Sequence, residues 1–325
     1  MQQTFFMCAF GTLFILFFST MGDGKNGPSE MPTFHADTAY QCIQKQVSFG
    51  PRVPNTQAHR LCGVYLHQQL TALGARVHVQ HFQAQAFDGK SLALQNIIAS
   101  FNPTCQKRIL LAAHWDTRPV ADKDEARPLQ PIEGANDGAS GVGVLLALAQ
   151  VISKHPPAGI GVDIIFFDGE DYGPPPGTFT TDNETVYWCL GAQYWSLHPH
   201  LPGYKAAYGV LLDMVGARDA TFYRERYSMY YAAGVVRKIW ALAQQLGHGR
   251  YFIPQDSKGH MLDDHVFVNQ VARIPMINIV DHGPGERSLF KAYHHTHRDN
   301  LTLVDKQTLQ AVGETLLHML YTASF

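Results

Sequence analysis

Continuous apolar runs alternate with helix-like periodic stretches along most of the chain. The runs have strand length and are rich in β-branched residues, which suits strands covered on both faces. The periodic stretches carry apolar residues at helical spacing, and one of them stops at Gly74. This alternation predicts an α/β fold, a three-layer α/β/α sandwich with a mostly parallel mixed central sheet. We expect strands at residues 92–101, 107–116, 162–171, 206–216 and 274–280, and helices at 55–74, 141–152, 235–246 and 307–321.

The N-terminal part of the chain has a different pattern. An uncharged run from Phe5 to Met21 is close in length to the core of a signal peptide and lies near the lower limit for a spanning helix. No Lys or Arg precedes the run and no small-x-small cleavage site follows it, so cleavage and retention both stay open. We therefore expect residues 1–22 to direct export as a signal peptide or N-terminal anchor, residues 23–35 to form a linker and residues 36–325 to form a single domain.

Composition and charge narrow the classes of partner. The chain has 325 residues, of which 46% are hydrophobic and 16% charged, so it can bury a substantial core. The net charge is −2 and there is no block of Lys and Arg, which argues against nucleic acid or an acidic membrane as a partner. A small or peptidic substrate fits better. Disulfides and buried free thiols both stay open for the four cysteines of the domain, Cys42, Cys62, Cys105 and Cys189.

Acidic residues and a histidine follow the apolar runs, where each expected strand ends. In open α/β sheets, ligands bind beyond the carboxyl ends of the strands, so these side chains should converge on one edge. Charges gathered beside a core are usually paired with one another or bound to a cation. The residues are His114 and Asp116 after the second run, Asp168, Glu170 and Asp171 after the third, and Asp213 in the fourth.

A glycine-rich turn, GANDGASG at 134–141, places Asp137 just before an expected helix. An isolated Asp at this position would usually be only a helix cap. Together with the strand-end acids, however, it becomes a candidate metal ligand. A catalytic zinc site uses three protein ligands and keeps one position open, and Asp137, one of the acids at 170 and 171, and a His of HHTHRDN (294–300) would supply that set. Because consecutive extended residues point in different directions, one of the two acids can hold the metal while the other acts as a general base.

Five motifs in this order resemble those of the zinc aminopeptidases of the M28 type and of their relatives, the glutaminyl cyclases. The motifs are HWD (114–116), GANDGASG, FFDGEDYG (166–173), LLDMVG (211–216) and HHTHRDN, and the resemblance spans residues 36 to 322. It implies that residues 36–325 form one zinc-dependent catalytic domain, with Asp137, Asp171 and His295 as the zinc ligands and Glu170 as the catalytic acid/base. The family usually has Glu where this chain has Asp171, whose side chain is one methylene shorter.

The segment MLDDHVFVNQVARIPMINIV (261–280) resembles the glutaminyl cyclases more than the peptidases. By that resemblance Asp263 joins Asp213 and Glu170 in a hydrogen-bonded acidic cluster beside the metal. Acids so close together are not all ionised, because like charges raise one another's pKa values. A shared proton suits proton transfer and weakens the case for a second cation, so one Zn²⁺ ion is favoured. Two-metal aminopeptidases add a second ion through the residues that match His114 and Asp213, and both are present here.

The function implied is a glutaminyl-peptide cyclotransferase. Its substrates would be peptides or proteins with an N-terminal Gln, which it would convert to pyroglutamate with release of ammonia; zinc would act as the Lewis acid and Glu170 would transfer the proton. The segments around LLDMVG resemble the bacterial cyclases, so export would be to the periplasm, in solution or anchored to the membrane.

The alternative function is an M28-type zinc aminopeptidase that hydrolyses N-terminal residues. A metal-free binding module is a third class, which the intact set of expected zinc ligands and Glu170 disfavours. The oligomeric state stays open, with a monomer as one option.

Aromatic residues and histidines near the motifs are candidates for a pocket wall around a small amide side chain. For each of them a plain place in the core is the competing interpretation, and a loop at 173–188 is long enough to cover the site. The pocket candidates are Trp188, Phe222 and His294, with Trp195 and Tyr223 as further aromatics. His114 and Asp116 are expected either to hold a second metal or to orient the metal ligands. Asp168 and His265 are expected to be structural. His297 is expected to lie on the surface.

Overall fold

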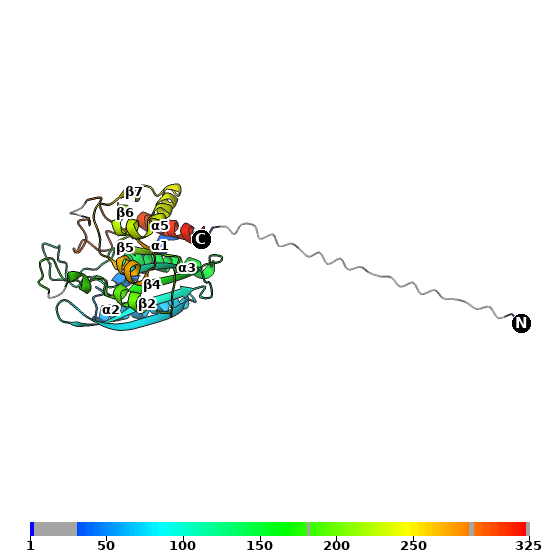
Figure 1. Cartoon of the computed structure of the whole chain (residues 1–325), viewed down its shortest axis with the longest axis horizontal. Helices are drawn as coiled ribbons and strands as arrows, with labels where there is room; N and C mark the ends of the chain where they lie inside the picture. Colours follow the sequence, from blue (N-terminus) through cyan, green and yellow to red (C-terminus); the bar gives the residue numbers. More distant parts are fainter. Residues whose placement is uncertain (3–30, 181–182, 286–288, 323–325) are drawn as a thin grey trace. The chain divides into compact units, whose positions relative to one another are not determined.

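A six-stranded mixed sheet forms the centre of the fold in the computed structural model (Figure 1). The last four strands in the spatial order run parallel to one another, while β2 is antiparallel to both of its neighbours. The mostly parallel mixed sheet predicted from the sequence is therefore confirmed. The spatial order is β1 (Arg76–Gln85), β2 (Ser91–Phe101), β4 (Gly161–Phe167), β3 (Arg108–His114), β5 (Tyr208–Asp213) and β8 (Met276–Val280).

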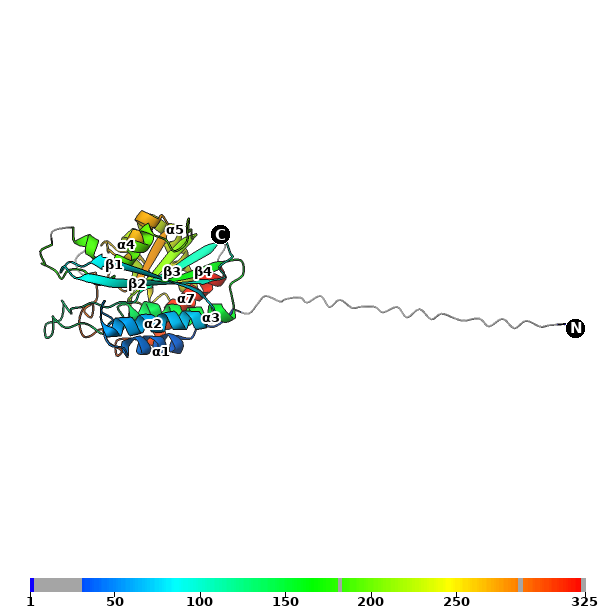
Figure 2. The same ribbon diagram turned by 90° about the horizontal axis from the view of Figure 1, so that it is seen from below.

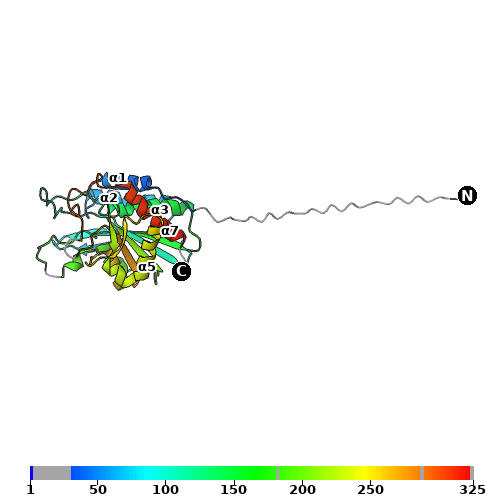
Figure 3. The ribbon, with the colours of Figure 1, turned by 90° about the horizontal axis from the view of Figure 1, so that it is seen from above.

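Helices cover both faces of this sheet, as Figures 2 and 3 show from opposite sides. One layer contains four helices, and the other contains two short helices and a π-helical turn. The sandwich therefore has the three layers predicted from the sequence. The first layer is α1 (Ala36–Val47), α2 (Gln57–Ala72), α3 (Ala139–Lys154) and α7 (Lys306–Tyr321); the second is α4 (Leu190–Leu197), α6 (Asp264–Phe267) and the π-helical turn η2 (Val268–Ala272).

The edge strand β8 is protected by α5 (Arg226–Gln245), which runs along it. The backbone N–H of Asn278 in β8 donates to the hydroxyl of Ser228 in α5, at 2.9 Å, so a backbone group at the sheet edge is not left free to pair with another chain. A small parallel ribbon of β6 (Phe222–Arg224) and β7 (Phe252–Asp256) packs beside α5. The short helix η1 (Glu184–Tyr187) lies in the loop before α4.

The central strands are continuous apolar runs because both of their faces are buried. Every residue of β3 is buried, and successive side chains point to opposite sides of the sheet. Ile109 and Leu111 pack under the layer of α1 and α3, whereas Leu110 and Ala112 pack under α4. Both clusters exclude water, so no polar position is tolerated in the middle of this strand.

The five expected strands and four expected helices are all present. Strands β2 and β8 end where expected, whereas β3, β4 and β5 end earlier. Because β4 stops at Phe167, the acids from Asp168 onward lie in the turn after the strand. Helix α5 begins at Arg226 and not at residue 235, because the Glu225 side chain caps it and a non-helical residue, Ala232, interrupts its periodicity. Helix α1 and strand β1 were not predicted, because their patterns are more polar.

The structure describes residues 1–2, 31–180, 183–285 and 289–322. The predicted signal peptide or anchor and most of the predicted linker lie outside the described residues. From Pro32 onward the chain forms one compact unit. Within the described ranges, no helix is both long and apolar enough to cross a membrane. Cys42, Cys62, Cys105 and Cys189 are all free thiols, and only Cys105 is not buried.

Candidate active site and metal centre

Three of the six polar residues expected at the strand ends, Glu170, Asp171 and Asp213, line one cavity of about 240 Å³. It lies at the carboxyl ends of β3, β4 and β5, where the convergence was expected. Five carboxylates face a wall of aromatic and imidazole rings across this cavity. The lining residues are Asp137, Glu170, Asp171, Trp188, Asp213, His260, Met261, Leu262, Asp263, Phe290, His294 and His295.

Asp137 is held in place by the turn that leads into α3. The next residue, Gly138, has φ +87°, and a Cβ there would lie 2.7 Å from the backbone oxygen of Asp116, so the turn needs glycine. The buried carboxylate of Asp299 accepts the backbone N–H groups of Asn136 and Asp137 at 2.7 and 2.9 Å. These contacts fix the backbone, so that the Asp137 side chain is presented to the cavity.

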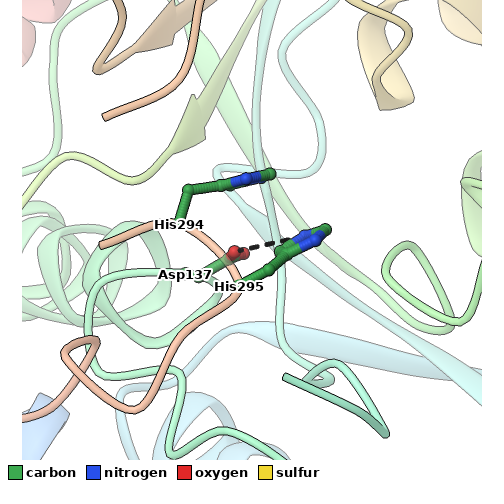
Figure 4. Close-up of side chains that lie close together, drawn as sticks. All are labelled: Asp137, His294 and His295. Carbon is green, nitrogen blue, oxygen red and sulfur yellow. Dashed lines mark ion pairs between the residues drawn. The ribbon is translucent and has the colours of Figure 1, made fainter. Parts of the chain in front are cut away.

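The three expected zinc ligands are brought together. His295 Nε2 lies 3.2 Å from Asp171 Oδ1 and 4.0 Å from Asp137 Oδ2, and Figure 4 shows the latter pair. The other oxygen of Asp171, Oδ2, is buried and has no hydrogen-bond partner. Burial and the nearby charge of Asp137 raise the pKa of Asp171. An unpartnered buried oxygen and mutually repelling carboxylates are what a cation relieves, and one nitrogen with two oxygens suits zinc.

His294 lies next to this set and offers a further nitrogen. Its ring stacks on those of His295 and Phe290, with centroid distances of 3.7 and 4.0 Å. Donor atoms of Asp137, His294 and His295 lie within 4.8 Å of one another (Figure 4). Burial and the neighbouring His295 lower the pKa of His294 well below its usual value, so its ring is neutral and able to donate a lone pair. His294 therefore lines the pocket, as the sequence suggested, and is also placed near a metal.

Two residues that the sequence analysis missed support the expected ligands from behind. Asp122 Oδ1 lies 3.0 Å from His295 Nδ1, on the opposite side of the ring from the cavity-facing nitrogen. Arg118, which is fully buried, donates to the Asp122 carboxylate through Nε and Nη2 and to the backbone oxygens of Asp171 and Gly173 through Nη1. Such a partner fixes the orientation of a metal-binding imidazole. Nothing in the sequence pairs Asp122 with a histidine so far away in the chain.

His114 bridges two of the carboxylates of the cavity. Its Nε2 lies 3.1 Å from Asp137 Oδ1 and 3.3 Å from Asp213 Oδ1, and the donor atoms of these three residues form a second possible metal cluster. Burial opposes protonation of His114, but hydrogen bonds to its carboxylate neighbours raise its pKa well above the usual value. Asp116 accepts the backbone N–H groups of Glu170 and Asp171 at 3.1 and 3.2 Å, so it shapes the turn that carries both acids.

Glu170, Asp213 and Asp263 all line the cavity. Burial raises the pKa of each of the three. The pKa of Asp213 is raised to about 7, and the charges of Asp263 and Asp137 add to the effect of burial. The pKa of Glu170 is raised well above its usual value, and the charges of Asp263 and Asp171 add to the effect. Carboxylate oxygens of Glu170 and Asp263 lie within 4.8 Å of each other, and the hydrogen-bonded cluster stays a prediction. Asp263 also accepts the Asn278 side-chain amide at 2.5 Å, because Asn278 in β8 points towards it. The cluster is thus coupled by charge.

A family model described as "Peptidase family M28" matches residues 96–320, which is more than half of the chain. The chain belongs to peptidase family M28. The likeness to solved M28 relatives extends over nearly the whole chain. A glutaminyl cyclase from Bacteroides thetaiotaomicron, bound to N-acetylhistamine, is 46% identical with a TM-score of 0.87, covering 90% of this chain and 100% of the relative. A glutaminyl cyclase from Tannerella forsythia is 49% identical with a TM-score of 0.85, over the same shares.

A more distant relative has a related name. The glutaminyl-peptide cyclotransferase of Drosophila melanogaster is 27% identical over 284 residues, which cover 79% of this chain and 73% of that protein. A shorter match, 29% identical over 136 residues, is to the alkaline phosphatase isozyme conversion protein of Escherichia coli, and it covers 38% of this chain. Two solved structures with peptidase names match as extensively as the cyclases. A Zn-dependent exopeptidase from Parabacteroides distasonis is 47% identical and a leucine aminopeptidase precursor from Bacteroides thetaiotaomicron is 46% identical, each with a TM-score of 0.86 over 90% of this chain and 100% and 99% of those chains.

The wall of this M28 site is built from fewer of the expected aromatics than the sequence suggested. Trp188 lines the cavity, and the Arg118 guanidinium lies 4.8 Å from the centroid of its ring. The plane of the Trp188 ring is nearly parallel to that of the His295 ring. Phe290, which was not predicted, lies beside His294. The prediction for Phe222 is wrong: its side chain is fully buried in the core and packs on Phe252, because β6 pairs with β7 away from the cavity.

The other candidates outside the cavity have structural partners. His59 Nε2 lies 2.8 Å from Asp168, and His265 Nε2 lies 3.1 Å from Glu225, as expected of structural residues. Trp195, a residue of α4, is fully buried, and Tyr223 packs edge-on against His282. His297 is not a free surface residue: its side chain is only 14% exposed, and its Nδ1 lies 3.0 Å from Asp124.

Proposed function

We propose that this M28 protein is a glutaminyl-peptide cyclotransferase, which converts the N-terminal glutamine of peptides or proteins to pyroglutamate and releases ammonia. The observation that carries the proposal is a small cavity in which a cluster of buried carboxylates faces a ring-lined wall beside the expected metal ligands. The similarity to bacterial proteins named glutaminyl cyclases, at 46–49% identity over 90% of the chain, supports it.

The cavity suits an N-terminal glutamine in size and in charge. Its volume of about 240 Å³ leaves room for one small residue. The carboxylates of Glu170, Asp213 and Asp263 attract a substrate α-amine, whereas Trp188 and Phe290 offer flat apolar surfaces to a planar amide. A free N-terminus and an amide side chain can thus be recognised by opposite sides of the same cavity.

Asp137, Asp171 and His295 would hold one zinc ion in this proposal. When bound, the ion supplies Lewis acidity that polarises the side-chain carbonyl of the substrate. A single ion is favoured because Asp213, which a second ion would need as a carboxylate, lies in the buried acidic cluster, where burial and the charge of Asp263 raise its pKa to about 7 and so favour a shared proton. The residues from 36 to 325 would form this one catalytic domain.

Glu170 would move the proton in the reaction. The α-amine of the substrate attacks the side-chain carbonyl carbon to close a five-membered ring, and the bond to the amide nitrogen then breaks to release ammonia. Glu170 accepts a proton from the attacking amine and delivers it to the departing nitrogen. Its position in a buried acidic cluster raises its pKa, which favours a group that must both accept and return a proton. Asp213 and Asp263 would keep that proton within the cluster.

The deciding experiment is mass spectrometry of two peptides incubated with the purified protein. One begins with Gln and the other with Leu. Loss of one ammonia from the Gln peptide, with the Leu peptide unchanged, is the result expected of a cyclase. Removal of a whole residue from either peptide would instead support a zinc aminopeptidase. That alternative is kept because His114, Asp137 and Asp213 form a second cluster that could hold a metal ion.

We also propose that the protein is exported to the periplasm, in solution or anchored to the membrane. This proposal is supported by the uncharged run between Phe5 and Met21. Cell fractionation of the full chain, with the N-terminus of the mature protein sequenced, would test it. A protein recovered intact from the cytoplasmic fraction would contradict it.

A further inference from the structure

The carboxylate of Glu170 has one hydrogen-bond donor among the side chains that the structure describes. The thiol of Cys189 lies 3.4 Å from Glu170 Oε1, within the normal range for a sulfur donor. The next cation, His114 Nδ1, is 4.0 Å from Oε2, too far for a hydrogen bond. The orientation of the carboxylate within the cavity thus depends on a contact with a cysteine.

The backbone joins the same two residues. The N–H of Cys189 donates to the backbone oxygen of Glu170 at 3.0 Å, and the N–H of Leu190 donates to that of Gly169 at 3.1 Å. Gly191 allows this close approach, since a Cβ there would lie 2.6 Å from the backbone nitrogen of Asp168. The start of α4 is therefore docked on the turn that carries Glu170. The thiol reaches the carboxylate from a fixed position.

Cys189 adopts a backbone conformation that non-glycine residues rarely use. It lies in the left-handed region, with φ 56° and ψ 37°, at the N-terminal cap of α4. Its side chain makes no capping hydrogen bond to the helix. Glycine would adopt this conformation without strain, and the cost of a side chain here needs a compensating interaction. The contact between the thiol and Glu170 is such an interaction.

The protonation state of the Cys189 thiol suits a hydrogen-bond donor and not a metal ligand or a nucleophile. Cys189 is fully buried, and burial, reinforced by the negative charge of Glu170, raises its pKa well above the usual value. Metal binding and nucleophilic attack both need the thiolate. A protonated thiol next to an ionised carboxylate donates to it.

We propose that Cys189 is a positioning residue, whose S–H hydrogen bond holds the Glu170 carboxylate in the orientation that transfers the proton. This inference rests on the proposed role of Glu170. Because a carboxylate free to rotate would still leave the pocket intact, the contact should affect turnover more than substrate binding.

Three variants separate the thiol from the backbone: Cys189→Ser, Cys189→Ala and Cys189→Gly. Each would be assayed for kcat and KM on a Gln-initiated peptide, with zinc content and Tm measured alongside. We expect the Ala and Gly variants to lose about tenfold in kcat, with KM changed less than about twofold, because each loses a hydrogen bond to a charged group. The Ser variant keeps a donor, and its kcat should exceed that of the Ala variant by at least about threefold.

Cys62→Ala is the matched control. Cys62 is also a fully buried free thiol, but it lies in the main core among residues of α2 and β2. Its loss should lower Tm and leave kcat unchanged. This control measures the cost of removing a buried thiol that does not touch Glu170.

Several outcomes would overturn the inference. A wild-type kcat in the Ala or Gly variant would show that the thiol does not position Glu170, and equal kcat values for Ser and Ala would show that the donor is irrelevant. If the Ala variant failed to fold, the Gly variant would carry the test, since glycine accepts the left-handed conformation. Failure of the wild type to cyclise the Gln peptide would instead contradict the proposed function, so the two failures are distinguishable.

Discussion

Asp122 holds His295 from the side opposite the cavity, with Oδ1 3.0 Å from Nδ1. Fixing this nitrogen leaves Nε2 directed at Asp171, 3.2 Å away. The expected histidine ligand is thus oriented before any metal binds. Asp122 is in turn held by the buried guanidinium of Arg118. Burial opposes protonation of His295, but the charge of Asp171, together with the contact to Asp122, raises its pKa above the usual value.

We predict that Asp122→Asn weakens zinc binding by about 10- to 100-fold, the usual cost of losing such a partner, because a neutral amide neither fixes nor polarises the imidazole as a carboxylate does. The measurement is zinc affinity by competition with a chromogenic chelator. Asp88→Asn is the control, since Asp88 pairs with Lys90 on the surface. Equal zinc affinity in both variants would show that Asp122 does not support the metal site.

Glu170→Gln should abolish turnover while zinc stays bound. The amide keeps the shape of the side chain but cannot carry the proton, and the expected loss in kcat is about 10²- to 10⁴-fold. Zinc content by elemental analysis and kcat on a Gln peptide check both halves of the prediction. The exposed Glu133→Gln is the control substitution. Turnover retained in the Glu170 variant would end the proposed role, whichever of the two reactions the wild type performs.

Trp188→Ala should raise KM for Gln peptides by about tenfold, with a smaller effect on kcat. The ring forms part of the cavity wall and is held by the Arg118 guanidinium, so its loss removes flat apolar surface from the substrate pocket. Steady-state kinetics on one Gln peptide would measure both parameters. Phe179→Ala is a suitable control because Phe179 is 90% exposed on the same loop. An unchanged KM would mean that Trp188 does not contact the substrate.

Glu225 makes stability depend on pH in a defined window. Burial alone would raise its pKa, but hydrogen bonds and charge from His265 and the backbone N–H groups of Tyr227 and Ser228 lower it to about 2, from an ordinary 4.5. Since the pKa is lower in the folded state than in the unfolded state, the unfolded chain binds the proton more tightly in acid. The stabilisation is therefore complete above pH 4.5 and is lost as the pH falls towards 2.

We accordingly expect Glu225→Gln to destabilise the protein by about 3 kcal/mol near neutral pH, the free energy that corresponds to this pKa shift. The difference from wild type should shrink as the pH is lowered from 4.5 towards 2. Urea unfolding of both proteins at several pH values measures it. A difference that did not change with pH would show that the ionised carboxylate is not the source of the stability.

Much of the fold and the chief site residues could be predicted from the sequence, because their signals are local. A strand covered on both faces must be apolar throughout, so β3 and β4 are visible as continuous runs. Glu170 and Asp171 follow β4 within a few residues, and Asp137 stands in the turn that leads into α3. In a parallel sheet, both the strand ends and the starts of the helices that follow strands lie at the carboxyl edge. Chain connectivity alone therefore predicts that they meet.

Only the tertiary structure decided which side chains complete the site. Phe222 and Phe290 are equally apolar, yet the first is in the core and the second in the cavity wall, because burial depends on which segments pack together and not on residue type. Asp122 meets His295, and Cys189 meets Glu170, across long stretches of chain. The sequence determined the strands, the turn acids and the ligand types. Their supporting partners are set by through-space contacts, which leave no periodic or local trace in the order of the residues.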